Sequence, residues 1–222
     1  MAVLFRFIAL GLGYLCGNFE SGFFYGLLHG VDLRTKGSGN IGTTNTLRNL
    51  GLGAGILTLV LDCLKAVIPA VVVYFFYPSN GVDMATTRLC MLYASFGAVL
   101  GHDFAFILKF KGGKGIASSL GMILVGFLPT LPFCVATFAI TLAISKYVSL
   151  GSILTAVCFA VTMPIFAALG FLPYEGTYLI EACVIGFIAA ALAIFLHRSN
   201  IDRLIHHNEN KFSFHPKKAE EK

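Results

Sequence analysis

Residues 52–76 read LGAGILTLVLDCLKAVIPAVVVYFF, a long apolar stretch with only two charged side chains, Asp62 and Lys65. A helix needs about 20 mostly apolar residues to cross the hydrocarbon core of a bilayer, so this stretch predicts a membrane-spanning helix. The same character extends through the chain, because 57% of its 222 residues are hydrophobic and 12% are charged. A typical soluble domain carries about 25% charged residues. The composition therefore indicates an all-α, polytopic integral membrane protein.

Further apolar stretches of span length lie on both sides of this one. Residues 116–145 are too many for a single helix, and Pro129 and Pro132 near the middle predict two short spans. The polar residues 146–152 are predicted to form a loop. The remaining predicted spans are Val3–Leu28, Thr87–Leu108, Ile153–Leu172 and Tyr178–Leu196. The total is about seven transmembrane helices in one domain, residues 1–222, which ends in a polar tail over residues 197–222.

The positions of lysine and arginine predict the orientation of the chain. An odd number of spans places the two termini on opposite sides of the membrane. Almost every lysine and arginine falls on the side of the tail, and only Arg6 and Arg88 lie near the other face. Because loops on the cytoplasmic side carry an excess of these residues, we expect a cytoplasmic C-terminus and an N-terminus outside.

The first polar island, residues 36–48, reads KGSGNIGTTNTLR. Its glycines allow a tight turn that exposes backbone N–H groups, and a helix beginning after it would direct its N-terminus at an anion. The island also contains the dinucleotide fingerprint Gly37-x-Gly39-x-x-Gly42, but the long apolar stretches around it do not fit a compact βαβ unit. A plain connection between two membrane helices is the other alternative. The candidate phosphate-binding residues are Ser38, Asn40, Gly42, Thr44, Asn45 and Arg48.

A second island combines Gly101-His102 with residues 110–119, FKGGKGIASS. Its spacing differs from that of a Walker A loop, but Lys111 and Lys114 on a glycine hinge can bind phosphate or carboxylate. The alternative is a basic anchor at a helix end. His102, Lys111 and Lys114 are therefore candidate binding residues.

A third island reads HRSNIDRL over residues 197–204 and is followed by Glu209. If the last span continues as a helix, His197, Asn200 and Arg203 follow one another at i, i+3 on one face. His197 and Asp202 also form a His-x4-Asp pattern that resembles the signature of acyl-coenzyme-A-dependent acyltransferases. Residues five apart on a helix point in different directions, so we interpret that match as accidental. An ordinary polar helix end is the alternative.

Ionisable groups inside a span are costly unless they pair. Asp62 and Lys65 stand at i, i+3, and we interpret them as a mutually neutralising structural pair rather than as catalytic groups. Asn18 and Glu20 are likewise polar residues inside the first predicted span. Glu181 is predicted to lie at the membrane–water interface. The six cysteines all lie in apolar runs without C-x-x-C pairs, which indicates buried thiols rather than disulfides or metal ligands.

Together the three islands resemble the motifs of the bacterial membrane glycerol-3-phosphate acyltransferases called the PlsY family, which use acyl phosphate as donor. The resemblance extends from Tyr14 to Lys211. The chain departs from the family at several positions, such as Ala105, where the family often has proline, and Glu20, where it usually has proline or a small residue. The second of these departures is unexplained by the sequence.

The resemblance implies that acyl phosphate and sn-glycerol 3-phosphate react to give 1-acylglycerol 3-phosphate and inorganic phosphate, at the cytoplasmic face of a bacterial inner membrane. It implies catalytic roles for Ser38, Lys114, His197 and Asn200, and substrate binding by Arg203 and Glu209 in addition to the residues above. The first island would receive acyl phosphate while Lys114 and Arg48 hold glycerol phosphate, or the reverse.

The proton acceptor would be His197 or a substrate phosphate. We expect no cofactor, no metal and no nucleic-acid partner. Membrane lipid would surround the protein, and the site is compatible with a monomer. An organic-phosphate transporter is the alternative function, although transporters usually show paired repeats, and none is visible here.

Overall fold

The computed structural model describes residues 2–212, and every regular element within these residues is a helix. The last ten residues of the predicted tail lie outside the described residues. In chain order the α-helices are α1 (Ala2–Gly17), α2 (Ser21–Leu28), α3 (Thr43–Leu50), α4 (Leu52–Ser79), α5 (Met84–Asp103), α6 (Ile116–Gly126), α7 (Leu131–Ser145), α8 (Val148–Ala168), α9 (Gly176–Leu196) and α10 (Arg198–Ile205). Three short 3-10 helices are η1 (Leu33–Thr35), η2 (Phe106–Leu108) and η3 (Leu128–Thr130).

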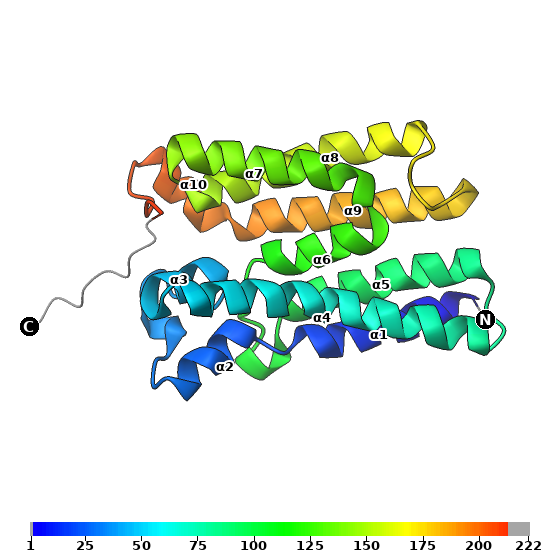
Figure 1. Cartoon of the computed structure of the whole chain (residues 1–222), viewed down its shortest axis with the longest axis horizontal. Coiled ribbons are helices and arrows are strands. Elements are labelled where there is room, and N and C mark those ends of the chain that lie inside the picture. Colours follow the sequence, from blue (N-terminus) through cyan, green and yellow to red (C-terminus); the bar gives the residue numbers. More distant parts are fainter. Residues whose placement is uncertain (1, 213–222) are drawn as a thin grey trace, which may run out of the picture.

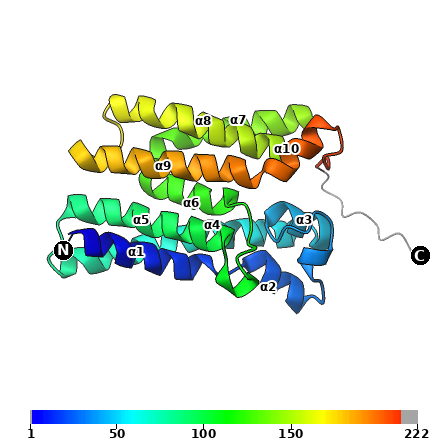
Figure 2. The same cartoon turned by 180° about the vertical axis from the view of Figure 1, so that it is seen from behind.

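The long helices run roughly parallel to one axis and form two groups, with α1, α4 and α5 in one and α7, α8 and α9 in the other (Figure 1). Helix α6 lies between them, and the view from behind shows the same arrangement (Figure 2). The start of α1 and helix α10 lie at opposite ends of the bundle, as predicted. The short helices α2, α3 and α10 gather at one end, which we call the polar end.

Six stretches within residues 2–212 are long and apolar enough to cross a membrane, which confirms the predicted all-helical membrane fold. Of the seven predicted spans, the first of the two short ones in residues 116–145 is not among these six. It corresponds to α6, whose 11 residues reach about 16 Å at the usual rise per residue, well short of the ~30 Å hydrocarbon core. In Figure 1 its connection to α7 stops short of the far end of the bundle. Helices α6 and α7 therefore form a hairpin that begins and ends at the polar end.

The tightest packing joins α1 to α5 through small residues that the sequence analysis did not single out. Gly13 and Gly17 of α1, and Gly97 and Gly101 of α5, form two GxxxG patterns. A Cβ atom at any of the four would collide with backbone of the facing helix. Because lipid tails supply no hydrophobic drive between helices, close backbone approach of this kind stabilises a membrane bundle.

Two predicted helix boundaries are wrong, namely the start of α8 and the end of α4. The predicted loop over residues 146–152 is helical from Val148, so Ser149 and Ser152 lie in the first turns of α8. The hydroxyl of Ser152 donates to the carbonyl of Val148 at 3.0 Å. This hydrogen bond pairs the hydroxyl within the helix, so a polar side chain is accommodated at this position. Helix α4 likewise continues through Pro78 to Ser79, three residues past the apolar stretch 52–76 that predicted it.

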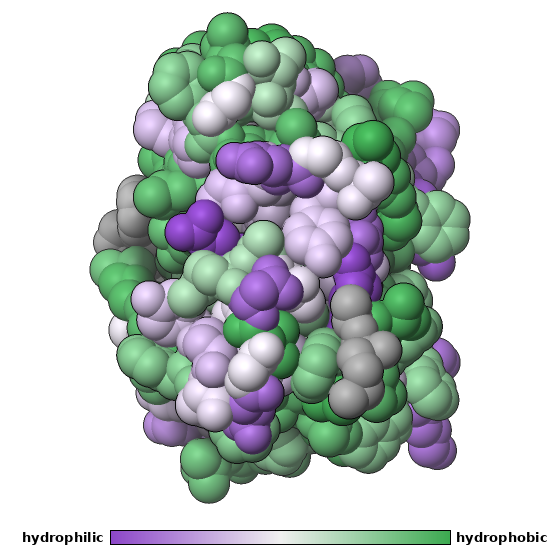
Figure 3. Space-filling view, turned by 90° about the vertical axis from the view of Figure 1, so that its right-hand side faces the viewer, coloured by the Kyte–Doolittle hydropathy of each residue, from purple (hydrophilic) through white to green (hydrophobic). Residues whose placement is uncertain are grey.

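Large apolar side chains cover the outside of the bundle, as expected where lipid is the solvent. Phe75 and Ile144 are 70% and 80% exposed. The core between the two groups of helices contains Phe96, Met122 and Phe159. Figure 3 views the end opposite the polar end, where hydrophilic residues lie across the middle and hydrophobic side chains surround them. All six cysteines are free thiols, of which Cys90 and Cys134 are buried as predicted and the other four are partly exposed.

Candidate active site

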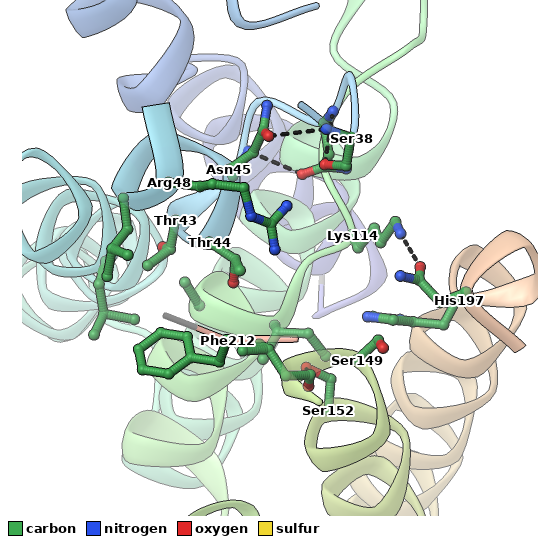
Figure 4. Close-up of a pocket in the computed structure, with 18 of the residues that line it drawn as sticks. Ser38, Thr43, Thr44, Asn45, Arg48, Lys114, Ser149, Ser152, His197 and Phe212 are labelled. Atoms are coloured by element: carbon green, nitrogen blue, oxygen red, sulfur yellow. Dashed lines mark hydrogen bonds between the residues drawn. The ribbon is translucent and has the colours of Figure 1, made fainter. Parts of the chain in front are cut away.

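A cavity of about 310 Å³ opens among α3, α6, α8 and the junction of α9 with α10, and all three predicted islands line it (Figure 4). The predicted site residues that line it are Ser38, Asn40, Gly42, Thr44, Asn45, Arg48, His102, Lys114, His197, Asn200 and Glu209. Residues from distant parts of the sequence therefore meet around one space. Lys111 and Arg203 are the two predicted site residues that do not line it.

The first island forms a loop held together by one side chain, Asn45. Its Oδ1 accepts from the backbone N–H of Ser38 at 3.0 Å, and its Nδ2 donates to the carbonyls of Leu33 and Lys36 at 3.2 and 3.0 Å. Gly37 has a positive φ of 59°, and a Cβ there would collide with the Asn45 carboxamide. Asn45 therefore shapes the loop, and the Ser38 side chain stands at the cavity.

The end of the first island continues directly into helix α3, which begins at Thr43 after Gly42. The Asn40 side chain accepts from the backbone N–H of Gly42 at 2.9 Å, and this bond fixes the turn into the helix. The first N–H groups of a helix lack partners and attract anions. The helix start therefore presents Thr43 and Thr44 to the cavity, as expected for a phosphate site.

Lys114 is carried by a loop that pairs with the end of α5. The N–H groups of Gly112 and Gly113 donate to the carbonyls of Asp103 and His102 at 3.2 and 2.9 Å. The Lys114 ammonium donates to Oδ1 of Asn200. Burial lowers the pKa of Lys114 to about 8, with a smaller contribution from the nearby positive charge of Arg203.

His197 lies at the kink between α9 and α10 and is buried. Its Nδ1 is 2.7 Å from the carbonyl of Ala193, and because a carbonyl only accepts, Nδ1 carries the proton. Burial lowers the pKa of His197 to about 4, so the neutral ring directs the lone pair of Nε2 away from that carbonyl. Figure 4 shows the ring pointing into the cavity.

A chain of polar contacts fixes the third island. Asn200 donates through Nδ2 to Glu209 at 3.1 Å, and Arg203 donates through Nε to the same carboxylate oxygen at 2.9 Å. Arg203 therefore acts on the cavity through Glu209. Asp202 is exposed and lies 3.4 Å from His206, away from the cavity, in agreement with the interpretation of His-x4-Asp as accidental.

Arg48 brings a second positive charge to the cavity. In Figure 4 its guanidinium extends into the same space as the Lys114 ammonium. Burial lowers the pKa of Arg48, although guanidinium remains charged at any physiological pH. Two partly buried cations facing one space favour an anionic ligand with more than one negative charge.

Four further residues line the cavity that were not among the predicted site residues, namely Thr43, Ser149, Ser152 and Phe212. Ser149 was hidden by the wrong boundary at the start of α8. Its hydroxyl is buried without a hydrogen-bond partner within the described residues. A serine pair spaced i, i+3 just after a polar break was the signal that could have revealed it.

An apolar cavity of about 260 Å³ continues from the polar one, between α6, α7, α8 and α9. The two cavities share Leu59, Ile116, Ala117 and Phe138 in their walls. The α9 side of the apolar cavity is made of small residues, Ala189, Ala190 and Ala193. We call this cavity the apolar slot. It offers an aliphatic chain a dry path that ends beside the cations.

A buried charged cluster adjoins the cavity and includes the predicted pair of Asp62 and Lys65 at 3.1 Å. The cluster also contains Glu20, 3.6 Å from the Lys65 ammonium, and His102, whose Nδ1 is 2.8 Å from Glu20. The donor atoms of Glu20, Asp62 and His102 lie within 4.8 Å of one another, a spacing that a metal ion could use. The Lys65 ammonium lies among them, so the side chain itself supplies the cation.

The fold and the site define a multi-pass membrane protein whose polar, cation-lined cavity continues into an apolar slot. The family model described as glycerol-3-phosphate acyltransferase matches residues 7–207. The chain therefore belongs to the glycerol-3-phosphate acyltransferase family, and it is a membrane-embedded acyltransferase.

Similar proteins cover almost the whole chain. Glycerol-3-phosphate acyltransferase of Endomicrobium trichonymphae is 36% identical over 97% of this chain and all of that protein. That of Shouchella clausii is 40% identical over 90% of this chain and 92% of the relative. Among solved structures, PlsY (YgiH) in its glycerol 3-phosphate form is similar with a TM-score of 0.76 and 32% identity, over 96% of both chains. The same protein in a lysophosphatidic acid form gives a TM-score of 0.76 at 30% identity.

Proposed function

We propose that the protein transfers an acyl group from an acyl phosphate to the 1-hydroxyl of sn-glycerol 3-phosphate. The products are 1-acylglycerol 3-phosphate and inorganic phosphate. The observation that carries this proposal is the continuity of the polar cavity with the apolar slot, because one space then holds two phosphates and an acyl chain. The forms in which the similar PlsY structure was solved are in accord with the acceptor and the product.

The apolar slot supports the place of the acyl chain. Its shared wall with the polar cavity, which includes Ile116 and Ala117, lies two to three residues after Lys114. A chain in the slot would present its activated carbonyl at this wall. The first island, with Ser38 and the start of α3, would then receive the phosphate of the donor, while Lys114 and Arg48 hold glycerol phosphate.

The proposed reaction is a single displacement. The glycerol hydroxyl oxygen bonds to the acyl carbon, the bond from that carbon to the phosphate oxygen breaks, and the electron pair leaves with phosphate. His197 accepts the hydroxyl proton through Nε2 and passes it to the released phosphate. A free ring with a pKa of about 4 is a weak base, but the negative charge of bound phosphates raises that pKa. Positioning and charge neutralisation supply most of the rate.

Phosphate release from the purified protein in detergent tests the reaction. We expect release with acyl phosphate and glycerol 3-phosphate together. Transfer from acyl-coenzyme A or acyl carrier protein would release a thiol and no phosphate, so these donors are compared by the formation of 1-acylglycerol 3-phosphate, and we expect none. Turnover with a thioester donor and none with acyl phosphate would contradict the proposal. An organic-phosphate transporter, the alternative function, would release no phosphate without a sealed membrane, and membership of an acyltransferase family already argues against it.

The assignment of the two substrates is tested separately. Ser38→Ala is expected to raise the KM for acyl phosphate more than the KM for glycerol 3-phosphate. Arg48→Ala is expected to do the opposite, because its guanidinium would hold the acceptor. The reverse pattern in both variants would exchange the two phosphate sites and leave the reaction itself intact.

We propose in addition that the polar end faces the cytoplasm of a bacterial inner membrane. The described residues at this end include most of the basic side chains, such as Lys36, Lys111 and Lys146, and cytoplasmic loops carry an excess of lysine and arginine. The water-soluble acceptor would then enter from the cytoplasm, and the donor from the membrane.

A further inference from the structure

The buried charged cluster contains Glu20, a residue that neither the resemblance nor the proposed reaction explains. Its side chain is 1% exposed, at the break between α1 and α2. One carboxylate oxygen contacts Nδ1 of His102 at 2.8 Å and the Lys65 ammonium at 3.6 Å, and the other has no hydrogen-bond partner within the described residues. Burying a carboxylate with one unsatisfied oxygen is costly. This cost points to a role for Glu20 through the side chains that it contacts.

Glu20 and Lys65 hold one side of the His102 ring. Nδ1 of His102 lies 2.7 Å from the Lys65 ammonium and 2.8 Å from the Glu20 carboxylate. Nδ1 either accepts from the lysine or donates to the carboxylate. Both arrangements direct Nδ1 toward this pair, and the opposite ring atom, Nε2, therefore faces away from it.

The other side of the ring lies against the loop that carries Lys114. A Cβ atom at Gly113 would collide with Nε2 of His102, so only glycine lets the backbone approach the ring this closely. The carbonyl of His102 also accepts from the N–H of Gly113 at 2.9 Å. His102 therefore supports the loop at two points, one residue before Lys114.

We infer that Glu20 is a positioning residue, which orients the His102 ring against Gly113 so that the loop presents Lys114 to the cavity. The inference rests on the role of Lys114 under the proposed function. Lys65 cannot replace this contact fully, because its ammonium is also bound by Asp62 at 3.1 Å and by the carbonyl of Phe19 at 3.0 Å. Removing Glu20 would leave the ring with one shared partner and let the loop relax toward solvent.

The first test measures kcat/KM and its pH profile for Glu20→Ala. Displacing a catalytic group by about 1 Å costs on the order of 100-fold, and we expect a loss of that order. We also expect the alkaline limb, which lies near pH 8 where Lys114 titrates, to move toward the ordinary lysine value of about 10.4. The titratable groups that face Lys114 are Arg198, Arg203, Glu209 and His197, and this variant leaves all of them in place.

Two controls separate positioning from general loss of stability. Glu181→Gln removes a carboxylate that pairs with Arg6 at 2.7 Å near the opposite end of the bundle, and we expect it to keep the alkaline limb unchanged. Glu20→Gln keeps a hydrogen-bonding group beside Nδ1, and we expect it to retain kcat/KM within about tenfold of the parent, less than the loss in Glu20→Ala. If Glu20→Gln is as impaired as Glu20→Ala, the charge and not the ring contact is responsible, and the inference is overturned.

The second test is a double-mutant cycle with Gly113→Ala, whose methyl group displaces the same ring. If both residues act through His102, the double variant loses no more than the worse single variant. The inference is overturned if the kcat/KM losses of the two single variants multiply in the double variant. It is also overturned if the alkaline limb of the kcat/KM profile is unchanged in Glu20→Ala. If Glu20→Ala does not fold, as judged by gel filtration in detergent, the cycle is run with Glu20→Leu, which fills a similar volume without a hydrogen-bonding group. Full turnover in Lys114→Ala would instead contradict the role of Lys114 and leave the proposed reaction intact, while the cycle still decides whether Glu20 and Gly113 act together.

Discussion

At the scale of the residue, the direction of each side chain separates two lysines that look alike in the sequence. Lys111 and Lys114 stand in one Lys-Gly-Gly-Lys run, but Lys111 is exposed outside the cavity and Lys114 lines it. The difference follows from the pairing of Gly112 and Gly113 with the end of α5, which turns the backbone between them. A charge in solvent contributes little, whereas one in a partly dry site acts strongly.

Alanine substitution of the two lysines is therefore expected to give unequal results. Lys114→Ala should lower kcat/KM by about 100-fold or more, because it removes a cation that faces transferring charge. Lys111→Ala should cost less than about threefold, as a screened surface charge. Phosphate release at several concentrations of each substrate measures both, and similar losses in the two variants would contradict the geometry of the cavity.

The pH dependence of the enzyme should reflect Lys114. Its pKa is lowered by burial to about 8, so the ammonium is present below that pH and is lost as the pH rises through it. We expect kcat/KM to fall above about pH 8, and the Lys114→Arg variant to move this fall upward, since guanidinium stays charged. A flat kcat/KM profile between pH 7 and 10 would argue against a charged Lys114 in the reaction.

At the scale of the element, α9 supplies both the proposed proton acceptor and a wall of the apolar slot. Ala189 lies eight residues before His197, about 12 Å deeper along the helix at its usual rise. The small side chains of this wall leave room between α6, α7, α8 and α9. The length of donor chain that fits should therefore depend on this face of α9.

Enlarging the wall should shorten the preferred donor. Ala189→Phe places an aromatic ring in the slot, and we expect kcat/KM for long-chain acyl phosphates to drop at least tenfold relative to short-chain ones. Comparing donors of different length in one preparation cancels differences in folded fraction. Ala160→Phe on α8 serves as the matched control, since Ala160 is absent from the walls of the slot. Equal losses for all chain lengths would place the acyl chain elsewhere.

At the scale of the whole molecule, the segments that bear Ser38, Lys114 and Asn200 meet because the α6–α7 hairpin returns to the end where it began. Without that return, the second and third islands would lie on opposite sides of the membrane. The same architecture predicts which positions share a side. Lys36 and Lys211 lie at the polar end, and Asn80 lies in the α4–α5 turn at the other end (Figure 1).

Cysteine labelling in intact bacterial cells checks the orientation. An impermeant thiol reagent should reach Asn80→Cys from outside, and should reach Lys36→Cys and Lys211→Cys only after the membrane is opened. The reverse pattern would invert the predicted topology. The parent protein gives the background from its own six cysteines, which are buried or partly buried.

The sequence by itself determined the class of protein and its three polar islands. Both follow from local composition. A run of apolar residues partitions into lipid whatever its neighbours are, and a glycine-rich phosphate loop is recognisable from about a dozen consecutive residues. The spans, the Asp62–Lys65 pair and the free cysteines were predictable on the same grounds.

Only the tertiary structure decided which residues meet. The helical start at Val148 that exposes Ser149, the bonding of Glu20 to His102, and the separation of Lys114 from Lys111 depend on backbone paths set by distant helices. Composition carries no information about these paths. The close contact of α1 with α5 is intermediate, since its glycine patterns are visible in the sequence but their partner is not. Helices in a membrane pair by the fit of their surfaces, and that fit depends on both helices, so the sequence of one helix does not identify its partner.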